Sequence, residues 1–164
     1  MRSRRTKLGL GTLAAMAAGA LMFAASGMGG GVGASGEDDR AAASAKRAKL
    51  TLIDTEYGEI LADRKGFALS LFTKEEGSKS RCYGECAEAW PPLNTKRKPR
   101  AGAGLDSGLL GRTERRNGRK QVTYDGHPLY YYVGDRDPGE VFCQDVREFG
   151  GRWYVVTADG EPVL

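Results

Sequence analysis

The sequence predicts a mainly β fold: a small antiparallel β domain built from two degenerate repeats, with one short helix at a Cys-x3-Cys segment. Polar and apolar residues alternate over residues 49–54, and residues 67–72 continue in β-favouring side chains. A pattern of Gly, Leu, aromatic, acidic, Cys and Trp residues occurs twice along the chain. Turn pairs punctuate its second half, at Asn117-Gly118, Asp125-Gly126 and Asp159-Gly160.

The two copies of the pattern keep the same order of residues. Each is a ten-residue segment followed by a Cys and a Trp: residues 66–75 with Cys82 and Trp90, and residues 126–135 with Cys143 and Trp153. A duplicated unit buries equivalent residues in equivalent places. We therefore expect three matched pairs in one shared core, namely Leu69/Leu129, Phe72/Tyr132 and Trp90/Trp153.

Other segments predict individual elements. Residues 112–124, with Asn117-Gly118 at their centre, predict a hairpin with a type I′ turn, because Asn-Gly readily takes positive φ angles. Further strands are expected over residues 129–133 and 152–157. The helix is expected over residues 83–90, where the following Pro-Pro pair ends it.

The N-terminus has the three parts of a secretory signal peptide, which we assign to residues 1–34. Residues 1–7 are positively charged, residues 8–25 are uncharged and mostly apolar, and small residues follow. The segment 35–48 lacks Leu, Ile, Val and aromatic residues, which predicts a flexible linker. The β domain is then expected over residues 49–164. The alternative is that the signal segment stays uncleaved. We expect attachment of the protein to a membrane only in that case.

The basic charge of the chain belongs largely to the signal segment. The chain has 25 Lys and Arg against 21 Asp and Glu, and the first acidic residue is Glu37. Without residues 1–34 the two counts are equal, at 21 and 21. Nucleic-acid binding needs a basic footprint on the folded domain, so the overall composition does not predict a nucleic-acid partner.

Three cysteines in an oxidising compartment predict one disulfide and one remaining thiol. Cys82 and Cys86 lie four residues apart and can pair within a short loop. Cys143 occupies the repeat position of Cys82, so a bridge between the two copies is the alternative pairing. Soft thiolates also select copper, which makes Cys82, Cys86, His127 and Cys143 an alternative set of copper ligands. Apart from this alternative, no cofactor is expected.

Two short sequences carry a family resemblance. Tyr130, Tyr132 and Asp135 form a Tyr-x-Tyr-x-x-Asp sequence, and Cys82-x3-Cys86 precedes a Trp-Pro-Pro sequence. In both features the chain resembles the bacterial secreted-repeat family of predicted lipoproteins, whose motif is Tyr-x-(Phe/Trp/Tyr)-x-x-Asp. The resemblance implies an exported domain whose activity is not settled.

The chain also departs from this family in two ways. In the first copy Ser70 and Glu75 stand where the motif has Tyr and Asp, so only the second copy carries the motif intact. No Cys precedes Cys82, so the lipidation Cys common in the family is absent.

The tyrosines of the motif have two interpretations. Tyr130 and Tyr132 share one face of the expected strand and Tyr131 lies on the other. These rings either pack within the sheet or form a platform that stacks sugar rings of a cell-wall polymer. Asp135 is expected to cap backbone N–H groups of a turn. The basic run over residues 96–100 is expected to be a solvated loop, with an anionic cell wall or lipid headgroups as its alternative partners.

The sequence contains no recognisable catalytic constellation. It has one His, no Cys–His spacing of a known nucleophile type and no phosphate-binding Gly loop. We therefore expect a non-enzymatic structural or binding module that is secreted or associated with the cell envelope, with a cell-wall polymer or an envelope protein as partner. The alternative is a redox or copper-handling accessory protein that uses the Cys-x3-Cys segment.

Overall fold

The computed structural model of the protein describes residues 47–164. Within them the strands form three sheets of three strands each. The first has the order β2-β1-β4 and consists of β1 (Lys49–Thr55), β2 (Gly58–Asp63) and β4 (Arg100–Ala101). The second has the order β3-β9-β8, with β3 (Ser70–Phe72), β8 (Val146–Glu148) and β9 (Gly151–Val155). The third has the order β5-β6-β7, with β5 (Leu110–Glu114), β6 (Lys120–Tyr124) and β7 (His127–Pro128).

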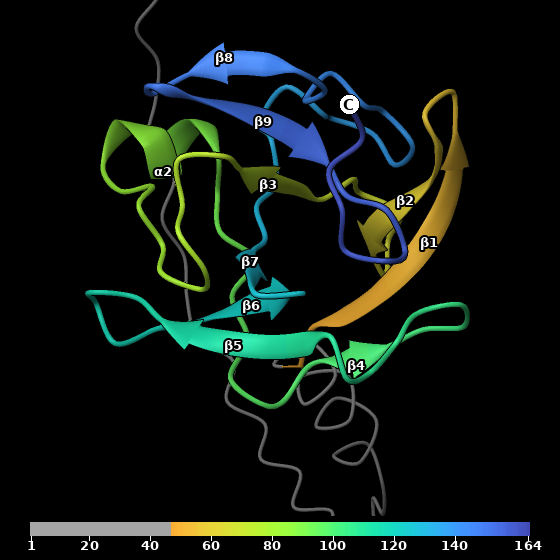
Figure 1. Cartoon of the computed structure of the whole chain (residues 1–164), viewed down its shortest axis with the longest axis horizontal. Coiled ribbons are helices and arrows are strands. Elements are labelled where there is room, and N and C mark those ends of the chain that lie inside the picture. Colours follow the sequence, from red (N-terminus) through yellow and green to blue (C-terminus); the bar gives the residue numbers. More distant parts are fainter. Residues whose placement is uncertain (1–46) are drawn as a thin grey trace, which may run out of the picture. The chain divides into compact units, whose positions relative to one another are not determined.

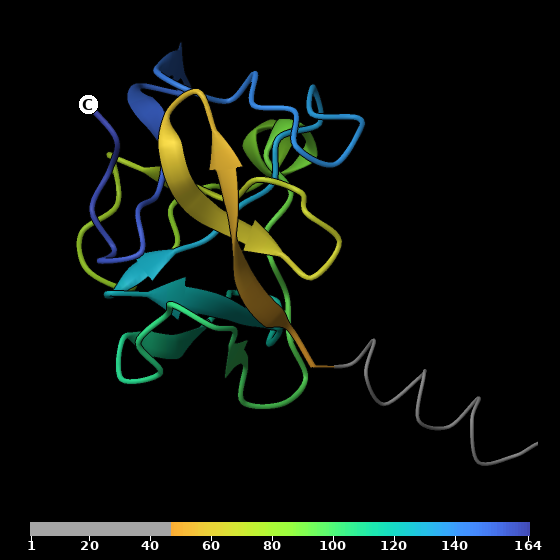
Figure 2. The same cartoon turned by 90° about the vertical axis from the view of Figure 1, so that its right-hand side faces the viewer.

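The second and third sheets lie at opposite ends of the domain (Figure 1). The β1–β2 hairpin runs between these two ends (Figure 2). The helix α2 (Glu85–Ala89) is the one α-helix among the described residues, and it falls within the predicted segment 83–90. Nearly all strand pairs are antiparallel; β1 and β4 are parallel. The predicted fold class, mainly β with one short helix at the Cys-x3-Cys segment, is confirmed.

The folded domain begins slightly before the predicted boundary. The N–H of Ala48 donates to the Thr95 hydroxyl at 3.2 Å, and its carbonyl accepts from the N–H of Arg100 at 3.0 Å. Ala48 therefore belongs to the fold rather than to the predicted linker 35–48. The rest of that linker and the predicted signal peptide, residues 1–34, lie outside the described residues, apart from Arg47. Between residues 47 and 164 no helix is long and apolar enough to cross a membrane.

The turn of the β5–β6 hairpin differs from the prediction. Gly118 has a φ of 76°, but Asn117 does not take a positive φ, so the predicted type I′ turn at this pair is wrong. A three-residue loop joins Arg115 to Arg119, whose N–H donates to the Asn117 side chain at 3.1 Å. Two other pairs have two positive φ angles: Asp125-Gly126, at 45° and 78°, joins β6 to β7, and Phe149-Gly150, at 54° and 80°, joins β8 to β9.

The predicted strand over residues 129–133 does not form a ladder. Its successive N–H groups bond to three different segments: Leu129 to Val122 at 3.0 Å, Tyr130 to Ser70 at 2.9 Å, and Tyr131 to Pro91 at 2.8 Å. A regular strand needs one neighbour along its length, so this segment makes isolated bridges instead. The predicted strand over 67–72 is shortened to β3 for the same reason. The strands β2, β4, β7 and β8 have no counterpart among the predicted strands.

Within each copy the same bond ties the central leucine to the copy's own hairpin. The N–H of Leu69 donates to the carbonyl of Leu61 at 2.9 Å, and the N–H of Leu129 donates to that of Val122 at 3.0 Å. Leu69 and Leu129 are both fully buried, as the repeat predicts. The β1–β2 and β5–β6 hairpins are therefore equivalent parts of the two copies.

Between the copies, each supplies a segment to the other's hairpin. The N–H of Leu61 in the first copy donates to the carbonyl of Val156 in the second at 2.8 Å. The N–H of Val122 in the second copy donates to the carbonyl of Leu93 in the first at 2.9 Å. Leu93 and Val156 each stand three residues after the Trp of their copy. The segment that follows each Trp thus forms a backbone hydrogen bond with the hairpin of the opposite copy.

Ser70 and Tyr130 mark the local twofold relation between the copies. They hold the same position in the two repeats, and they exchange both backbone hydrogen bonds, each at 2.9 Å. An equivalent pair that bonds reciprocally lies on the axis that relates the two units. The backbones of the two copies therefore contact each other at this pair of residues.

The core consists of two clusters, so the prediction of one shared core for all three pairs is wrong: Leu69 and Leu129 lie in one cluster, and the aromatic pairs lie in or against the other. In that second cluster four aromatic rings form a stack, in the order Phe72, Trp153, Trp90, Tyr132. The two indoles lie face to face, with centroids 3.9 Å apart and planes at 4°. Phe72 stacks on Trp153 at 4.2 Å and Tyr132 on Trp90 at 4.3 Å, so each Trp contacts the aromatic residue of the other copy. Both tryptophans and Phe72 are buried as predicted, whereas Tyr132 is half-buried and reaches the surface.

Candidate functional site

The acidic residues of the two motif copies close the loops that lead to the cysteines. Glu75 Oε1 accepts from the N–H of Arg81 at 2.8 Å, directly before Cys82. Asp135 Oδ1 accepts from the N–H of Phe142 at 2.7 Å, directly before Cys143. Asp135 thus caps a backbone N–H group, the role expected of it. A carboxylate that accepts a backbone N–H satisfies a donor that the loop would otherwise leave unpaired.

Tyr130 connects the second copy to the acid of the first. Its ring is fully buried against the edge of Trp153, with centroids 5.2 Å apart. Its hydroxyl donates to Glu75 Oε1 at 2.5 Å, while Glu75 Oε2 is buried without a hydrogen-bond partner. Burial raises the pKa of Glu75 to about 7, although the bonds from Tyr130 and Arg81 oppose this shift. The same burial raises the pKa of the Tyr130 hydroxyl above its ordinary value.

The equivalent contact, from residue 70 of the first copy to Asp135 of the second, is missing. Ser70 stands where the motif has Tyr, and neither its hydroxyl nor Asp135 Oδ2 has a hydrogen-bond partner. The Cys143 thiol lies beside both groups, and burial raises its pKa to about 12. Because Ser70 replaces the Tyr of the motif, this place holds the buried Cys143 thiol and two oxygens without a hydrogen-bond partner. The equivalent place holds the hydrogen bond between Tyr130 and Glu75.

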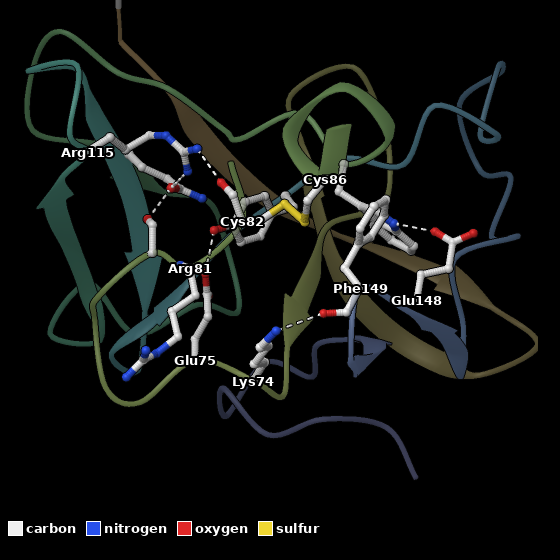
Figure 3. Close-up of a disulfide and its surroundings, with 12 residues drawn as sticks. Lys74, Glu75, Arg81, Cys82, Cys86, Arg115, Glu148 and Phe149 are labelled. Carbon is white, nitrogen blue, oxygen red and sulfur yellow. Dashed lines mark hydrogen bonds between the residues drawn. A yellow bond between two sulfur atoms is a disulfide. The ribbon is translucent and has the colours of Figure 1, made fainter. Parts of the chain in front are cut away.

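A buried polar network lies to one side of the disulfide, at Cys82 (Figure 3). The guanidinium of Arg115 is buried and donates to the carbonyl of Cys82 at 2.5 Å and to Gln121 Oε1 at 2.6 Å. Ser80 donates to the same Gln121 oxygen at 2.6 Å, and Gln121 donates to the carbonyl of Leu129 at 2.9 Å. The network is absent from the sequence predictions. Nothing in the residue pattern distinguishes Arg115 from the exposed arginines that follow it.

The structure joins Cys82 to Cys86 in a disulfide, with Cα atoms 5.2 Å apart, and leaves Cys143 as a buried free thiol. Gly84 lies inside this small loop with a φ of 58°, and α2 begins directly after it. The alternative bridge between the copies, which would use Cys143, is not formed.

The four residues considered as copper ligands do not form a ligand set. Two of them are consumed by the disulfide, and metal binding requires deprotonated thiols. Cys143 holds its proton because of its burial, and His127 lies in β7, half-buried, beside Tyr124. Across residues 47–164, no group of three or more His, Cys, Asp or Glu side chains could hold a metal ion.

The tyrosines divide between two environments, in the alternation that the sequence predicts. Tyr130 and Tyr132 both pack against the cluster that contains the tryptophans, and Tyr131 packs against the other core cluster. Tyr131 and Tyr132 are each half-buried and line a surface hollow of about 370 Å³. The hollow is lined by aromatic, apolar and polar residues; besides the two tyrosines they are Asp63, Lys65, Phe67, Ala68, Pro91 and Asp135.

Both tyrosines of this hollow are fixed in place. Tyr132 stacks on Trp90, and the hydroxyl of Tyr131 donates to Asp63 Oδ2 at 3.1 Å. Asp63 Oδ1 also accepts the N–H groups of Lys65 at 2.8 Å and Phe67 at 3.2 Å. The hollow is therefore shaped before any ligand enters, which lowers the entropy cost of binding.

Two interlocked copies of one β pattern, each with a carboxylate that closes its cysteine loop, define a two-repeat β domain. A family model described as a secreted repeat of unknown function matches residues 51–94 and 111–157, one match for each copy. The matches cover more than half of the chain, and the chain belongs to this secreted repeat family. The predicted family is thereby confirmed. No curated protein and no solved structure matched the sequence.

The disulfide gives a direct prediction for thiol counts. Unfolded without reductant, the protein should react at one thiol, Cys143, and after reduction at three, when alkylated peptides are analysed by mass spectrometry. The folded protein should react slowly, because the Cys143 thiol is buried and protonated. Three reactive thiols without reductant would contradict the disulfide and reopen the copper alternative.

The Glu75 carboxyl gives a prediction for the pH dependence of stability. Its pKa is about 7 in the folded protein against 4.5 ordinarily, so between these pH values the folded state holds a proton that the unfolded chain has lost. The contribution of Glu75 to the free energy of unfolding therefore falls as the pH rises from about 4.5 to about 7, by at most about 1.4 kcal/mol per pH unit. Denaturant titrations should show that Glu75→Gln removes this slope.

The exposed Glu85→Gln is the control, and it should keep the pH profile of the natural protein. If Glu75→Gln and the natural protein lose stability equally over this pH range, the buried carboxyl is not the group that titrates.

Proposed function

We propose that this protein is a non-enzymatic binding module of the cell envelope, and that the aromatic hollow binds the sugar rings of a cell-wall polymer. Membership of a secreted repeat family supports a location outside the cytoplasm. The observation that carries the proposal is the pair Tyr131 and Tyr132, which offer half-buried rings to one hollow beside Asp63 and Lys65.

The chemistry of a sugar ring fits this arrangement. A sugar has an apolar face, which stacks on an aromatic ring, and a rim of hydroxyl groups, which bond to polar side chains. In the hollow, Phe67 and Pro91 add apolar surface, and Lys65 and Asp63 supply polar atoms. Few polar groups among mainly apolar lining residues are typical of sites that bind small ligands or polymer units.

The state of the acidic residues favours binding over catalysis. Asp63 accepts three hydrogen bonds from the protein itself, and Asp135 accepts one from a backbone N–H. Glu75, the carboxyl with the raised pKa, is bonded inside the core to Tyr130 and Arg81. These carboxyls act as fixed supports of loops and rings, so we assign them no reacting role.

The proposal predicts that Tyr131→Ala weakens binding to the cell wall. The mature chain should sediment with purified insoluble cell walls, and Tyr131→Ala should lower its affinity about tenfold, the effect of losing about 1.4 kcal/mol of ring contact. Tyr57→Ala is the matched control, because Tyr57 is 36% exposed at the β1–β2 turn and lines no part of the hollow. Thermal melting should show that both variants are folded.

Two results would contradict the proposal. One is failure of the natural protein to bind cell walls. The other is release of soluble wall fragments during the incubation, which would make the protein an enzyme.

A further inference from the structure

A second hollow, of about 240 Å³, adjoins the aromatic one. The two share three lining residues, Asp63, Lys65 and Tyr131, and so lie next to each other. The second hollow is strongly basic, because Arg47, Lys49, Arg64 and Lys65 all line it. Asp63 is the one carboxylate among its lining residues, and three hydrogen bonds already hold that carboxylate.

The basic run over residues 96–100 lies next to this hollow. Arg100 pairs with Lys49 in the β1–β4 ladder, and its N–H bonds to the carbonyl of Ala48. The Thr95 hydroxyl accepts from the N–H of Ala48 and donates to the carbonyl of Arg97 at 2.7 Å. The run is therefore held against the strand that lines the hollow.

Together these residues form what we call the basic surface: Arg47, Lys49, Arg64, Lys65, Lys96, Arg97, Lys98 and Arg100. All of its side chains are exposed or half-buried. In the domain as a whole, Lys and Arg nearly balance Asp and Glu, so this concentration of one sign reflects segregation and not composition. Clustered cations at a depression attract anions and concentrate them there.

We propose that the basic surface binds the anionic groups of a charged cell-wall glycopolymer, a chain in which phosphates or carboxylates alternate with sugar units. This inference rests on the proposed function, because the sugar of such a chain would occupy the adjoining aromatic hollow. A ligand that carries rings and charges in succession matches two neighbouring hollows, of which one is lined by aromatic rings and the other by basic side chains.

A membrane surface fits the basic surface less well than a polymer does. Proteins that lie on a bilayer insert apolar side chains beside their basic residues. Among the described residues the exposed large apolar side chains are Tyr57, Val133, Phe142, Phe149 and Leu164, and none lies in the basic surface. A concave depression also fits an extended polymer chain better than it fits the surface of a membrane.

The test compares two triple variants with equal loss of charge. Arg47→Gln, Arg97→Gln and Arg100→Gln together alter the basic surface but none of the residues shared with the aromatic hollow. The control, Arg119→Gln with Arg136→Gln and Arg147→Gln, removes three exposed charges elsewhere. The probes are soluble glycosylated poly(ribitol phosphate), neutral dextran, phosphatidylglycerol vesicles and single-stranded oligothymidine. Affinities are measured by calorimetry at low and at physiological salt.

The natural protein should bind the glycosylated poly(ribitol phosphate) more tightly than dextran, and salt should weaken that binding. The basic-surface variant should lose about tenfold or more in affinity and most of the salt dependence, and the control variant about twofold or less. Equal binding of dextran, or an unaffected basic-surface variant, would overturn this inference and leave the proposed function intact.

Tighter binding to the vesicles or to oligothymidine would overturn the inference in favour of another anionic partner. Failure to bind any of the glycans, together with failure to bind cell walls, would overturn the proposed function as well.

Discussion

The contact between the indoles of Trp90 and Trp153 joins two copies that could otherwise be separate units. Their centroids are 3.9 Å apart, and each Trp is covered on its other face by an aromatic ring of the opposite copy, Phe72 or Tyr132. Neither copy therefore encloses its own Trp. The backbone follows the same rule, since the segment after each Trp bonds to the hairpin of the other copy. Both core clusters contain residues of the two repeats, so we expect the repeats to unfold as one cooperative unit.

This core also determines what reaches the surface. Because Tyr132 lies at the end of the ring stack, it is half-buried and forms a wall of the aromatic hollow. Tyr131, its neighbour in sequence, points to the other core cluster and is fixed by Asp63 of β2. The hollow thus combines residues of both copies. Loss of contact between the copies would remove the hollow together with the core.

The order of residues predicted the fold class, the repeat and the burial of both tryptophans, because these features depend on how residues are spaced along the chain. It failed where the partner of a segment changes from residue to residue, as at Leu129, Tyr130 and Tyr131. The hollow could not be predicted for a related reason. Tyr131 and Asp63 are 68 positions apart, and no local pattern signals their contact. The network of buried Arg115 likewise depends on residues brought together only by the fold.

Native-state hydrogen exchange tests the cooperative core most directly. The N–H of Leu69 bonds within the first copy and that of Leu129 within the second, so each reports on the opening of its own copy. Amides that exchange only through global unfolding share one free energy of opening. We expect Leu69 and Leu129 to exchange with equal free energies of opening that match the free energy of unfolding from denaturant titration. Exchange of one of them at a clearly lower free energy, while the other stays protected, would contradict this account.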